Sequence, residues 1–342
     1  MATIPASHGY WRSAAQRLWQ DPLARVCAVI LGFYFILVLA ATFGWVAQDW
    51  NEEVGVSYAN PNMLAAYPNP QGKNSLITLD KYQVDDASRA VDPLAGYYEK
   101  IEQRARDYAS VERKPQWTLP FGGDKWGRDI ITKTIKAGQI SITVGMAAAL
   151  LAVTIGVVLG ALGGYFGGWI GDTLEWLYNI FTSVPYILLV LTFAAVFGRG
   201  VETVVLVLGL TGWTGVYRLI RAEYIKQRGL EYVQAAAAIG ASDGRRMFRH
   251  ILPNVSHLIL IQLSQLVVEF IKAEVILSFL GFGVPTELVS WGIQINEVLT
   301  ELVLGKWWQL TAAALAMSVF VVAFGLFTDV LRDALDPKTS RR

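Results

Sequence analysis

The stretch ITVGMAAALLAVTIGVVLGALGGY, residues 142–165, is an apolar run without a charged side chain. A helix needs about 20 mostly apolar residues to cross the hydrocarbon core of a bilayer, so this stretch predicts a membrane-spanning helix. Gly156, Gly160 and Gly164 recur within it at every fourth residue, which lets another helix approach its backbone closely. The sequence leaves open whether that second helix belongs to this chain or to a partner.

Four further stretches outside this run have the length and composition of membrane spans, and a fifth, residues 203–220, is shorter and ends at Arg218, which can snorkel to the headgroups. Hydrophobic residues make up 54% of the 342 residues and charged residues only 17%, against about 45–50% and about 25% in soluble domains. We therefore expect an all-α membrane protein with six transmembrane helices. Besides residues 142–165, the predicted spans are residues 26–47, 177–197, 203–220, 255–280 and 307–331.

Two of these spans need comment. The apolar run at residues 26–47 exceeds the ~7–15 residues of a secretory signal, and no small-residue cleavage site follows it. We therefore interpret it as a retained anchor. Pro185 lies inside the third span, where it should kink or locally open the helix because it lacks a backbone N–H.

Lysine and arginine residues in the short flanks indicate the topology. They gather in the N-terminal flank (residues 1–25), between spans four and five (residues 221–254) and in the C-terminal tail, which includes residues 338–342. Six spans place all three on one side, which the positive-inside rule makes the cytoplasm. The polar residues 48–139 then form a sizeable external insert, with a predicted helix at residues 86–110. The remaining five spans occupy residues 140–337.

Composition excludes several classes of site. The net charge of +1 shows no bias toward nucleic acid. The single cysteine, Cys27, excludes an intramolecular disulfide and a cysteine-based metal cage, and three histidines are too few and too scattered to predict a metal site. The Gly-Lys pairs at residues 72–73 and 305–306 lack the rest of a P-loop. With no catalytic triad either, we expect no catalytic residue, metal or cofactor in this chain.

The segment GLEYVQAAAAIGASDGRRMFRHILPN, residues 229–254, predicts a helix, a break and a second helix. Residues 231–239 are rich in alanine, a good helix former. Gly240 suits a left-handed C-cap, and Ser242 or Asp243 suits the next N-cap. We expect a short rigid elbow on the membrane surface, fixed by a span at each end. An interfacial loop without a partner is one alternative. A DNA-binding helix-turn-helix is another, but the spans would keep it from a major groove.

Three ionisable residues, Glu269, Lys272 and Glu274, lie within the fifth predicted span. Such groups are costly in lipid and normally face a cavity or one another. Glu269 and Lys272 are three residues apart and could pair on one helix face. The sequence therefore leaves open a polar lining for a translocation path and a structural ion pair. Residues 281–291, apolar with Gly and Pro, should dip back along the outer mouth.

The elbow carries a resemblance to a known family. Its Gln234-Ala235-Ala236, Gly240 and Leu252-Pro253 are spaced as in the EAA loop of ABC importer permeases. Gln234 stands where the family has Glu, so this chain lacks a charge at that point.

Four further stretches narrow the resemblance to the dipeptide/oligopeptide branch, in its second (C-type) permease. FGGDKWGRD (121–129) is similar to that branch's LGTDxxGRD, and the others are GYFGGW (164–169), LSFLGFG with SWG (277–283 and 290–292) and LRDALDP (331–337). The resemblance covers the first span and residues 119–337, but not residues 48–118. It implies a MetI-like permease core at residues 140–337.

Three groups of candidate functional residues result; the resemblance implies the docking and mouth groups, and the path group comes from the proline and the ionisable residues within the spans. Docking to an ATPase subunit would involve Glu231, Gln234, Ala235, Ala236, Gly240, Arg245, Arg249, Leu252 and Pro253. The translocation path would include Pro185, Glu269, Lys272 and Glu274. The external mouth would include Leu277, Ser278, Phe279, Gly281, Gly283 and Trp291.

The resemblance also implies partners and a location. The chain would form half of a translocation pathway for di- or oligopeptides, together with a second, similar permease. Two ATP-binding cassette subunits would use ATP and Mg²⁺, and an extracytoplasmic binding protein would deliver the substrate. The location would be the bacterial cytoplasmic (inner) membrane, with lipid around the spans and both termini cytoplasmic.

Two alternatives stay open at this point. Members of the same family could carry another substrate, such as nickel, an oligosaccharide or a peptide-like antibiotic. A secondary transporter that works alone would instead predict inverted repeats or paired broken helices, and the sequence contains no convincing internal repeat.

Overall fold

The computed structural model describes residues 7–64 and 116–335. The chain divides into two compact units. They are the membrane unit (residues 1–48 and 132–342) and the insert unit (residues 49–131). The predicted helix at residues 86–110 lies outside the described residues.

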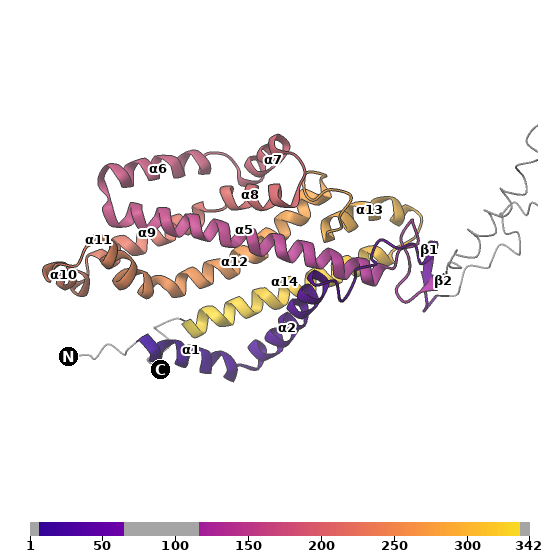
Figure 1. The fold of residues 1–342 in the computed structure, drawn as a ribbon, viewed down its shortest axis with the longest axis horizontal. Helices are drawn as coiled ribbons and strands as arrows, with labels where there is room; N and C mark the ends of the chain where they lie inside the picture. The colour runs from indigo at the N-terminus through magenta and orange to yellow at the C-terminus, as the bar shows by residue number, and fades with distance from the viewer. Residues whose placement is uncertain (1–6, 65–115, 336–342) are drawn as a thin grey trace, which may run out of the picture. The chain divides into compact units, whose positions relative to one another are not determined.

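Helices account for the regular structure of the described part of the membrane unit (Figure 1). The first residues of α5 belong to the insert unit. In chain order the helices are α1 (Ser7–Gln20), α2 (Pro22–Thr42), α5 (Ile130–Phe166), α6 (Gly168–Thr182), α7 (Tyr186–Phe197), α8 (Val201–Thr211), α9 (Thr214–Arg228), α10 (Glu231–Ala238), α11 (Asp243–Arg245), the π-helical turn η2 (Arg246–Ile251), α12 (Leu252–Phe279), α13 (Trp291–Val303) and α14 (Trp308–Leu335).

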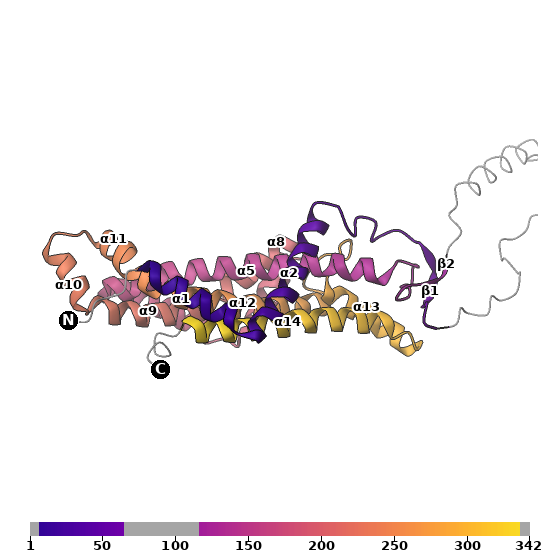
Figure 2. The same ribbon diagram turned by 90° about the horizontal axis from the view of Figure 1, so that it is seen from below.

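An aromatic core joins three of these helices. α14 packs against α2, α12 and α13 (Figure 2). The Tyr34 hydroxyl of α2 donates to the Ala316 carbonyl of α14 at 2.8 Å. The Tyr34 and Phe320 ring centroids are 5.3 Å apart, and those of Phe320 and Trp291 are 6.3 Å apart. Burial of such large apolar surfaces is the main favourable contribution to packing between these helices.

Five helices among the described residues are long and apolar enough to cross a membrane, and six spans result if the bent pair α6–α7 counts as one. The first span ends at Thr42, short of the predicted residue 47. Gly44 is left-handed there, with φ 73°. The Trp45 N–H donates to the Ala40 carbonyl at 2.8 Å, which ends the helix in a Schellman turn. By contrast, α5 begins well before the predicted span at residue 142.

The third predicted span is broken rather than merely kinked. α6 ends at Thr182, α7 begins at Tyr186, and the two helices meet at 86°. Pro185 is the N-cap residue of α7. It has no N–H to continue α6, and its ring restricts Val184 to extended conformations. The sequence predicted that Pro185 would kink or locally open the helix, and the structure confirms an opening at this position.

The glycine stripe of α5 faces α9 of the same chain. A Cβ atom at Gly160 would lie 2.9 Å from the carbonyl oxygen of Tyr217, and one at Gly164 would lie 2.5 Å from that of Arg221. No side chain fits so close to a neighbouring backbone. The sequence left open whether this glycine stripe packs within the chain or against a partner. In the structure it packs against a helix of the same chain.

The insert unit contains a pair of short parallel strands that the sequence patterns do not predict. β1 (Gly55–Pro61) lies beside β2 (Gln116–Leu119). The register places Gly55 opposite Gln116 and Pro61 opposite Leu119, with an irregularity between these pairs.

The motif at residues 121–129 folds into a tight loop that packs against β1 and is hydrogen-bonded to it. Asp124 is buried, and its Oδ1 accepts the backbone N–H of Arg128 at 3.0 Å. The Gly127 carbonyl accepts the N–H of Gly55 at 2.8 Å. Gly127 has φ 78°, and a Cβ atom there would lie 1.9 Å from the Gly55 carbonyl oxygen, so only glycine fits. This motif therefore has a structural role in the insert unit.

Candidate functional site

The elbow, residues 229–254, follows α9. Its first helix, α10, ends at Ala238, with Ile239 as the C-cap residue and Gly240 next in the chain, at φ 85°. The Ala241 N–H donates to the Ala236 carbonyl at 2.9 Å, and the Gly240 N–H donates to the Ala237 carbonyl at 3.0 Å. These are the two hydrogen bonds of a Schellman cap. The predicted left-handed cap at Gly240 is confirmed.

The second half of the elbow continues into a membrane span. Ser242 is the N-cap residue of α11, and the wide turn η2 leads from α11 into α12. Pro253, in the first turn of α12, lacks the N–H that would bond one turn back, and a π-helical turn is a known accommodation of such a gap. The helix that crosses the membrane therefore starts before Pro253, because residues 243–279 form one run.

Two tyrosines fasten the elbow to the spans. The Tyr232 hydroxyl donates to Gln227 Oε1 at 2.8 Å and accepts from Asn254 Nδ2 at 3.0 Å. It thereby links α9, α10 and α12, and burial raises the pKa of its phenol above 10.0. The Tyr224 hydroxyl of α9 donates to the Met247 carbonyl at 3.3 Å.

Asp243 joins the elbow to the end of α5. The Tyr165 hydroxyl donates to Asp243 Oδ1 at 2.7 Å. Arg246 forms an ion pair with the same carboxylate, and Arg228 donates to the Tyr165 carbonyl. The elbow is therefore held by α5, α9 and α12, which makes it a stiff bracket rather than a free loop.

The elbow presents apolar side chains on its surface. Ile239 is 87% exposed and Phe248 is 63% exposed. Large apolar side chains exposed outside the membrane spans are candidates for contact with a partner. Ala236 is buried and Leu252 partly buried. The other predicted coupling residues are exposed, namely Glu231, Gln234, Ala235, Gly240, Arg245, Arg249 and Pro253.

Gln234, where the family pattern has Glu, makes a contact that a glutamate could not. Its Nε2 donates to the Gly229 carbonyl at 3.2 Å, across the turn that starts α10. An ionised carboxylate has no hydrogen to donate. The departure from the pattern thus exchanges a charge for a local hydrogen bond.

The residues predicted to line a path occupy different environments. Glu269 and Lys272 are both exposed on α12. The contacts of the described residues include no ion pair between Glu269 and Lys272, so the structure does not show the structural ion pair that the sequence left open. Their place in a translocation path stays a prediction, as does that of Pro185 at the α6–α7 break.

Glu274 is fully buried and bonded within the protein. The Ser278 hydroxyl donates to Glu274 Oε1 at 2.7 Å and accepts from the Val284 N–H at 3.1 Å. Ser141 and Ser290 lie beside the same carboxylate. A carboxylate away from water needs such partners. Glu274 therefore ties α12 to the loop that precedes α13.

The predicted mouth residues form a packed corner. A Cβ atom at Gly283 would lie 2.1 Å from Ser278 Oγ, so the loop after α12 folds tightly back onto that helix. Leu277, Ser278, Gly283 and Trp291 are buried, whereas Phe279 and Gly281 are partly exposed.

A group that sequence reasoning missed joins α5, α13 and α14, and we call it the polar joint. Lys133 Nζ lies 2.6 Å from Glu297 Oε2, and Gln309 Nε2 donates to the same oxygen at 3.0 Å. Gln294 Nε2 donates to Thr134 Oγ1 at 3.2 Å. The available signal was the spacing of Gln294 and Glu297, which puts two polar side chains on one face of an apolar helix.

The two groups differ in what they offer chemically. Among the described residues, no three His, Cys, Asp or Glu side chains lie close enough together to hold a metal ion. The elbow offers a stiff surface for a partner, and the polar joint offers a fixed connection between helices.

Comparison with known proteins identifies relatives. The family model for a binding-protein-dependent transport system inner membrane component matches residues 152–341, more than half of the chain. The dipeptide transport system permease protein DppC of Bacillus subtilis (strain 168) is 37% identical over 221 residues, covering 65% of this chain and 69% of that protein.

Two oligopeptide transport system permease proteins OppC are similarly related. That of Bacillus subtilis (strain 168) is 33% identical over 244 residues, covering 71% of this chain and 80% of that protein. That of Salmonella typhimurium (strain LT2) is 38% identical over 218 residues, covering 64% and 72%. A crystal structure of an amino acid ABC transporter with histidines aligns with a TM-score of 0.46 and 15% identity, over 59% of this chain and 93% of that one.

The matched residues of the family model include the elbow, α9, α12 and the part of α5 that contacts the elbow. The predicted MetI-like fold and the resemblance to C-type permeases are confirmed by these matches. The chain belongs to the family of inner-membrane components of binding-protein-dependent transport systems.

Proposed function

We propose that this chain is the C-type permease of an ATP-driven peptide importer, and that the elbow transmits the movement of ATPase subunits to the spans. The observation that carries this proposal is the construction of the elbow. It is a surface bracket with exposed apolar side chains, and hydrogen bonds fix it to α5, α9 and α12.

This construction suits the transmission of force. A push on α10 reaches α9 and α12 through Tyr232, and a push on α11 reaches α5 through the contact between Asp243 and Tyr165. Because a packed interior deforms little, such a push displaces whole helices. ATP binding would close the ATPase subunits and rock the spans from an inward-facing to an outward-facing arrangement.

The relatives support the proposed substrate and partners. DppC and OppC are named for dipeptide and oligopeptide transport, which supports peptides as the substrate here. The assembly would contain a second, similar permease, two ATP-binding cassette subunits and an extracytoplasmic binding protein. ATP hydrolysis is assigned to the cassette subunits, and this chain supplies part of the path.

The proposed orientation places the elbow in the cytoplasm and the α13 end outside. α1 and the end of α14 lie toward the same end of the membrane unit as the elbow (Figure 1). Their basic flanks and the basic elbow then share the cytoplasmic side, as the positive-inside rule requires. The insert unit would be external.

A pair of matched variants tests the role of the elbow. Ile239 in the elbow and Val303 at the end of α13 are both apolar and both 87% exposed. Helices α10 and α13 lie at opposite ends of the membrane unit (Figure 1). We expect Ile239→Glu to abolish copurification of the ATPase subunits and peptide-stimulated ATP hydrolysis in the reconstituted complex. Val303→Glu should leave the ATPase subunits attached.

The same measurement identifies the contrary outcome. Normal attachment and normal stimulated hydrolysis in the Ile239→Glu complex would show that α10 does not contact the ATPase. A panel of dipeptides and oligopeptides, with nickel and oligosaccharides as controls, then tests the substrate. Stimulation by a control in place of peptides would overturn the assignment to peptides.

A further inference from the structure

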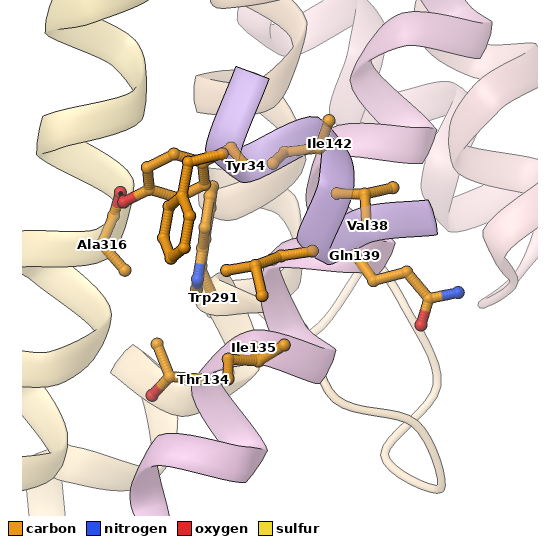
Figure 3. A pocket seen from close by; sticks show the side chains of 11 residues that line it. Tyr34, Val38, Thr134, Ile135, Gln139, Ile142, Trp291 and Ala316 are labelled. Carbon is orange, nitrogen blue, oxygen red and sulfur yellow. Dashed lines mark hydrogen bonds between the residues drawn. The ribbon is translucent and has the colours of Figure 1, made fainter. Parts of the chain in front are cut away.

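An apolar pocket lies between four helices of the membrane unit, beside the second half of α2 and the first part of α5 (Figure 3). Its volume is about 110 Å³, and its walls are mostly carbon. Its lining includes Tyr34 and Val38 of α2, Ile135 and Gly138 of α5, Trp291 of α13 and Ala316 of α14.

The pocket contains one unused hydrogen-bond donor. Trp291 is fully buried, and its backbone N–H donates to Ser141 Oγ at 3.2 Å. Its indole N–H, however, has no partner among the described residues. Figure 3 shows the ring nitrogen among the lining side chains, on the side of Thr134. A buried donor without a partner is unfavourable, so an acceptor that enters the pocket would be stabilised there.

The depth of this donor in the bilayer follows from α2. This helix has 21 residues, a length of about 31 Å, which matches the ~30 Å hydrocarbon core. The Gln139 amide of α5 donates to Thr42 Oγ1, at the end of α2, at 3.1 Å. The neighbouring Gly138 faces Trp291, because a Cβ atom there would lie 2.8 Å from the indole ring. The donor therefore lies at the boundary of the hydrocarbon, where the ester carbonyls of phospholipids lie.

The pocket is reachable from the side of the molecule that faces lipid. Phe33, one of its lining residues, is 59% exposed. It belongs to a row of exposed apolar side chains on α2 together with Val26, Val29 and Ile36. An apolar row of this kind on a membrane span meets acyl chains.

We propose that this pocket binds one membrane phospholipid, with the ester carbonyl of an acyl chain accepting a hydrogen bond from the Trp291 indole N–H. A cavity of ~150 Å³ takes up benzene, so the present volume holds the first carbons of a chain. Hydrocarbon suits this pocket better than water, because the wall is mostly apolar and its polar atoms come only from a few lining residues, chiefly Trp291, Thr134 and Gln139.

The test compares an ester lipid with an ether lipid that lacks the carbonyl. The full complex is stripped of lipid in detergent and titrated with palmitoyl-oleoyl phosphatidylethanolamine or its diether analogue, and native mass spectrometry counts the retained molecules. We expect Trp291→Phe to weaken retention of the diester lipid about fivefold, the effect of one ordinary hydrogen bond. The diether should bind wild type as weakly as the diester binds Trp291→Phe. The control is Trp213→Phe, at a buried tryptophan outside the pocket, and it should change nothing.

A second pair of variants tests the pocket itself. Val38→Phe fills the pocket and should abolish this retained lipid, whereas Val29→Phe, on the exposed face of the same helix, should not. Equal retention in wild type, Trp291→Phe and Val38→Phe would overturn the proposal. Equal binding of diester and diether lipids to wild type would do the same. The measurement reads lipid alone, so its result is independent of the substrate that the complex carries.

Discussion

At the α10 end of the membrane unit most polar side chains lie on the surface, whereas at the α13 end Lys133, Gln294 and Gln309 are almost completely buried. The elbow uses its hydrogen bonds to fix its own shape and leaves Ile239 exposed. The polar joint uses its hydrogen bonds to lock α5, α13 and α14 to one another. The two ends therefore differ in purpose, because one is built for a partner and the other for cohesion.

This difference predicts which end tolerates change. In a protein interior, removing one partner of a charge pair leaves the other uncompensated, which is strongly unfavourable. On a surface, the solvent replaces most lost contacts. Substitutions in the polar joint should therefore act on stability, and substitutions in the elbow should act on coupling.

The largest effect is expected at Lys133. Lys133→Met leaves the Glu297 carboxylate, which is mostly buried, without its cation. We expect the free energy of unfolding in detergent to fall by about 3 kcal/mol, measured by thermal or denaturant unfolding. The double variant Lys133→Met with Glu297→Met removes both charges and should recover more than half of the loss. If the double variant is less stable than the single one, the joint is not held by this pair.

The next effect concerns the packing of α5 against α9 near the elbow. At Gly164 a Cβ atom would lie 2.5 Å from a backbone oxygen of α9, whereas at Gly163 its nearest neighbour would be 3.4 Å away. Gly164→Ala should therefore destabilise the protein by about 2 kcal/mol, and Gly163→Ala should have little effect. Similar melting temperatures for the two variants would show that α5 and α9 can separate without cost.

A smaller effect, on coupling, is expected at Gly240. Its φ of 85° suits glycine, and a Cβ atom at this position would have no other atom within 4 Å, so Gly240→Ala costs only backbone strain of about 1 kcal/mol. Gly244, in the same elbow, also has open space but no positive φ. We expect Gly240→Ala to lower peptide-stimulated ATP hydrolysis while Gly244→Ala preserves it. If the two variants lose equal amounts of peptide-stimulated ATP hydrolysis, the cap at Gly240 does not determine the shape of the surface that the ATPase subunit binds.

The smallest effect is expected at Gln234. Gln234→Glu removes the donor to the Gly229 carbonyl and adds the charge of the family pattern. Because the side chain is exposed, stability should change by less than about 0.5 kcal/mol, as unfolding measurements can show. Peptide uptake should stay close to that of wild type. A large rise in uptake would show that the partner surface carries a cation for a glutamate at this position.

The membrane spans were predictable because lipid imposes a length and a composition on each helix separately. The cap at Gly240 was predictable for a similar reason, since it depends on a few neighbouring residues. The polar joint was not, because Lys133 and Glu297 are brought together only by the packing of α5 against α13. The sharp turn at Pro185 was foreseen as a bend, but its 86° angle depends on what α6 and α7 pack against.

The strand pair of the insert unit was out of reach of local patterns for another reason. β1 and β2 are far apart in the sequence and run in parallel, so neither a turn signal nor a hairpin spacing links them. The motif at residues 121–129 was noticed by resemblance alone. Its structural reason, the close approach of Gly127 to Gly55, became visible only once the strands were placed.

The parallel pairing of β1 and β2 also limits how this chain can be shortened. Pro61, where β1 ends, lies opposite Leu119, and β2 starts at Gln116 opposite Gly55. Because parallel strands begin at the same end, the segment between them must run back over the length of β1. That length is roughly 20 Å at the rise of an extended strand. Parallel neighbours need a crossover of about a dozen residues or more. A trimmed version with a two-residue turn in place of residues 62–115 would have to give up the pairing, so a graft or deletion here should keep a return path of that length.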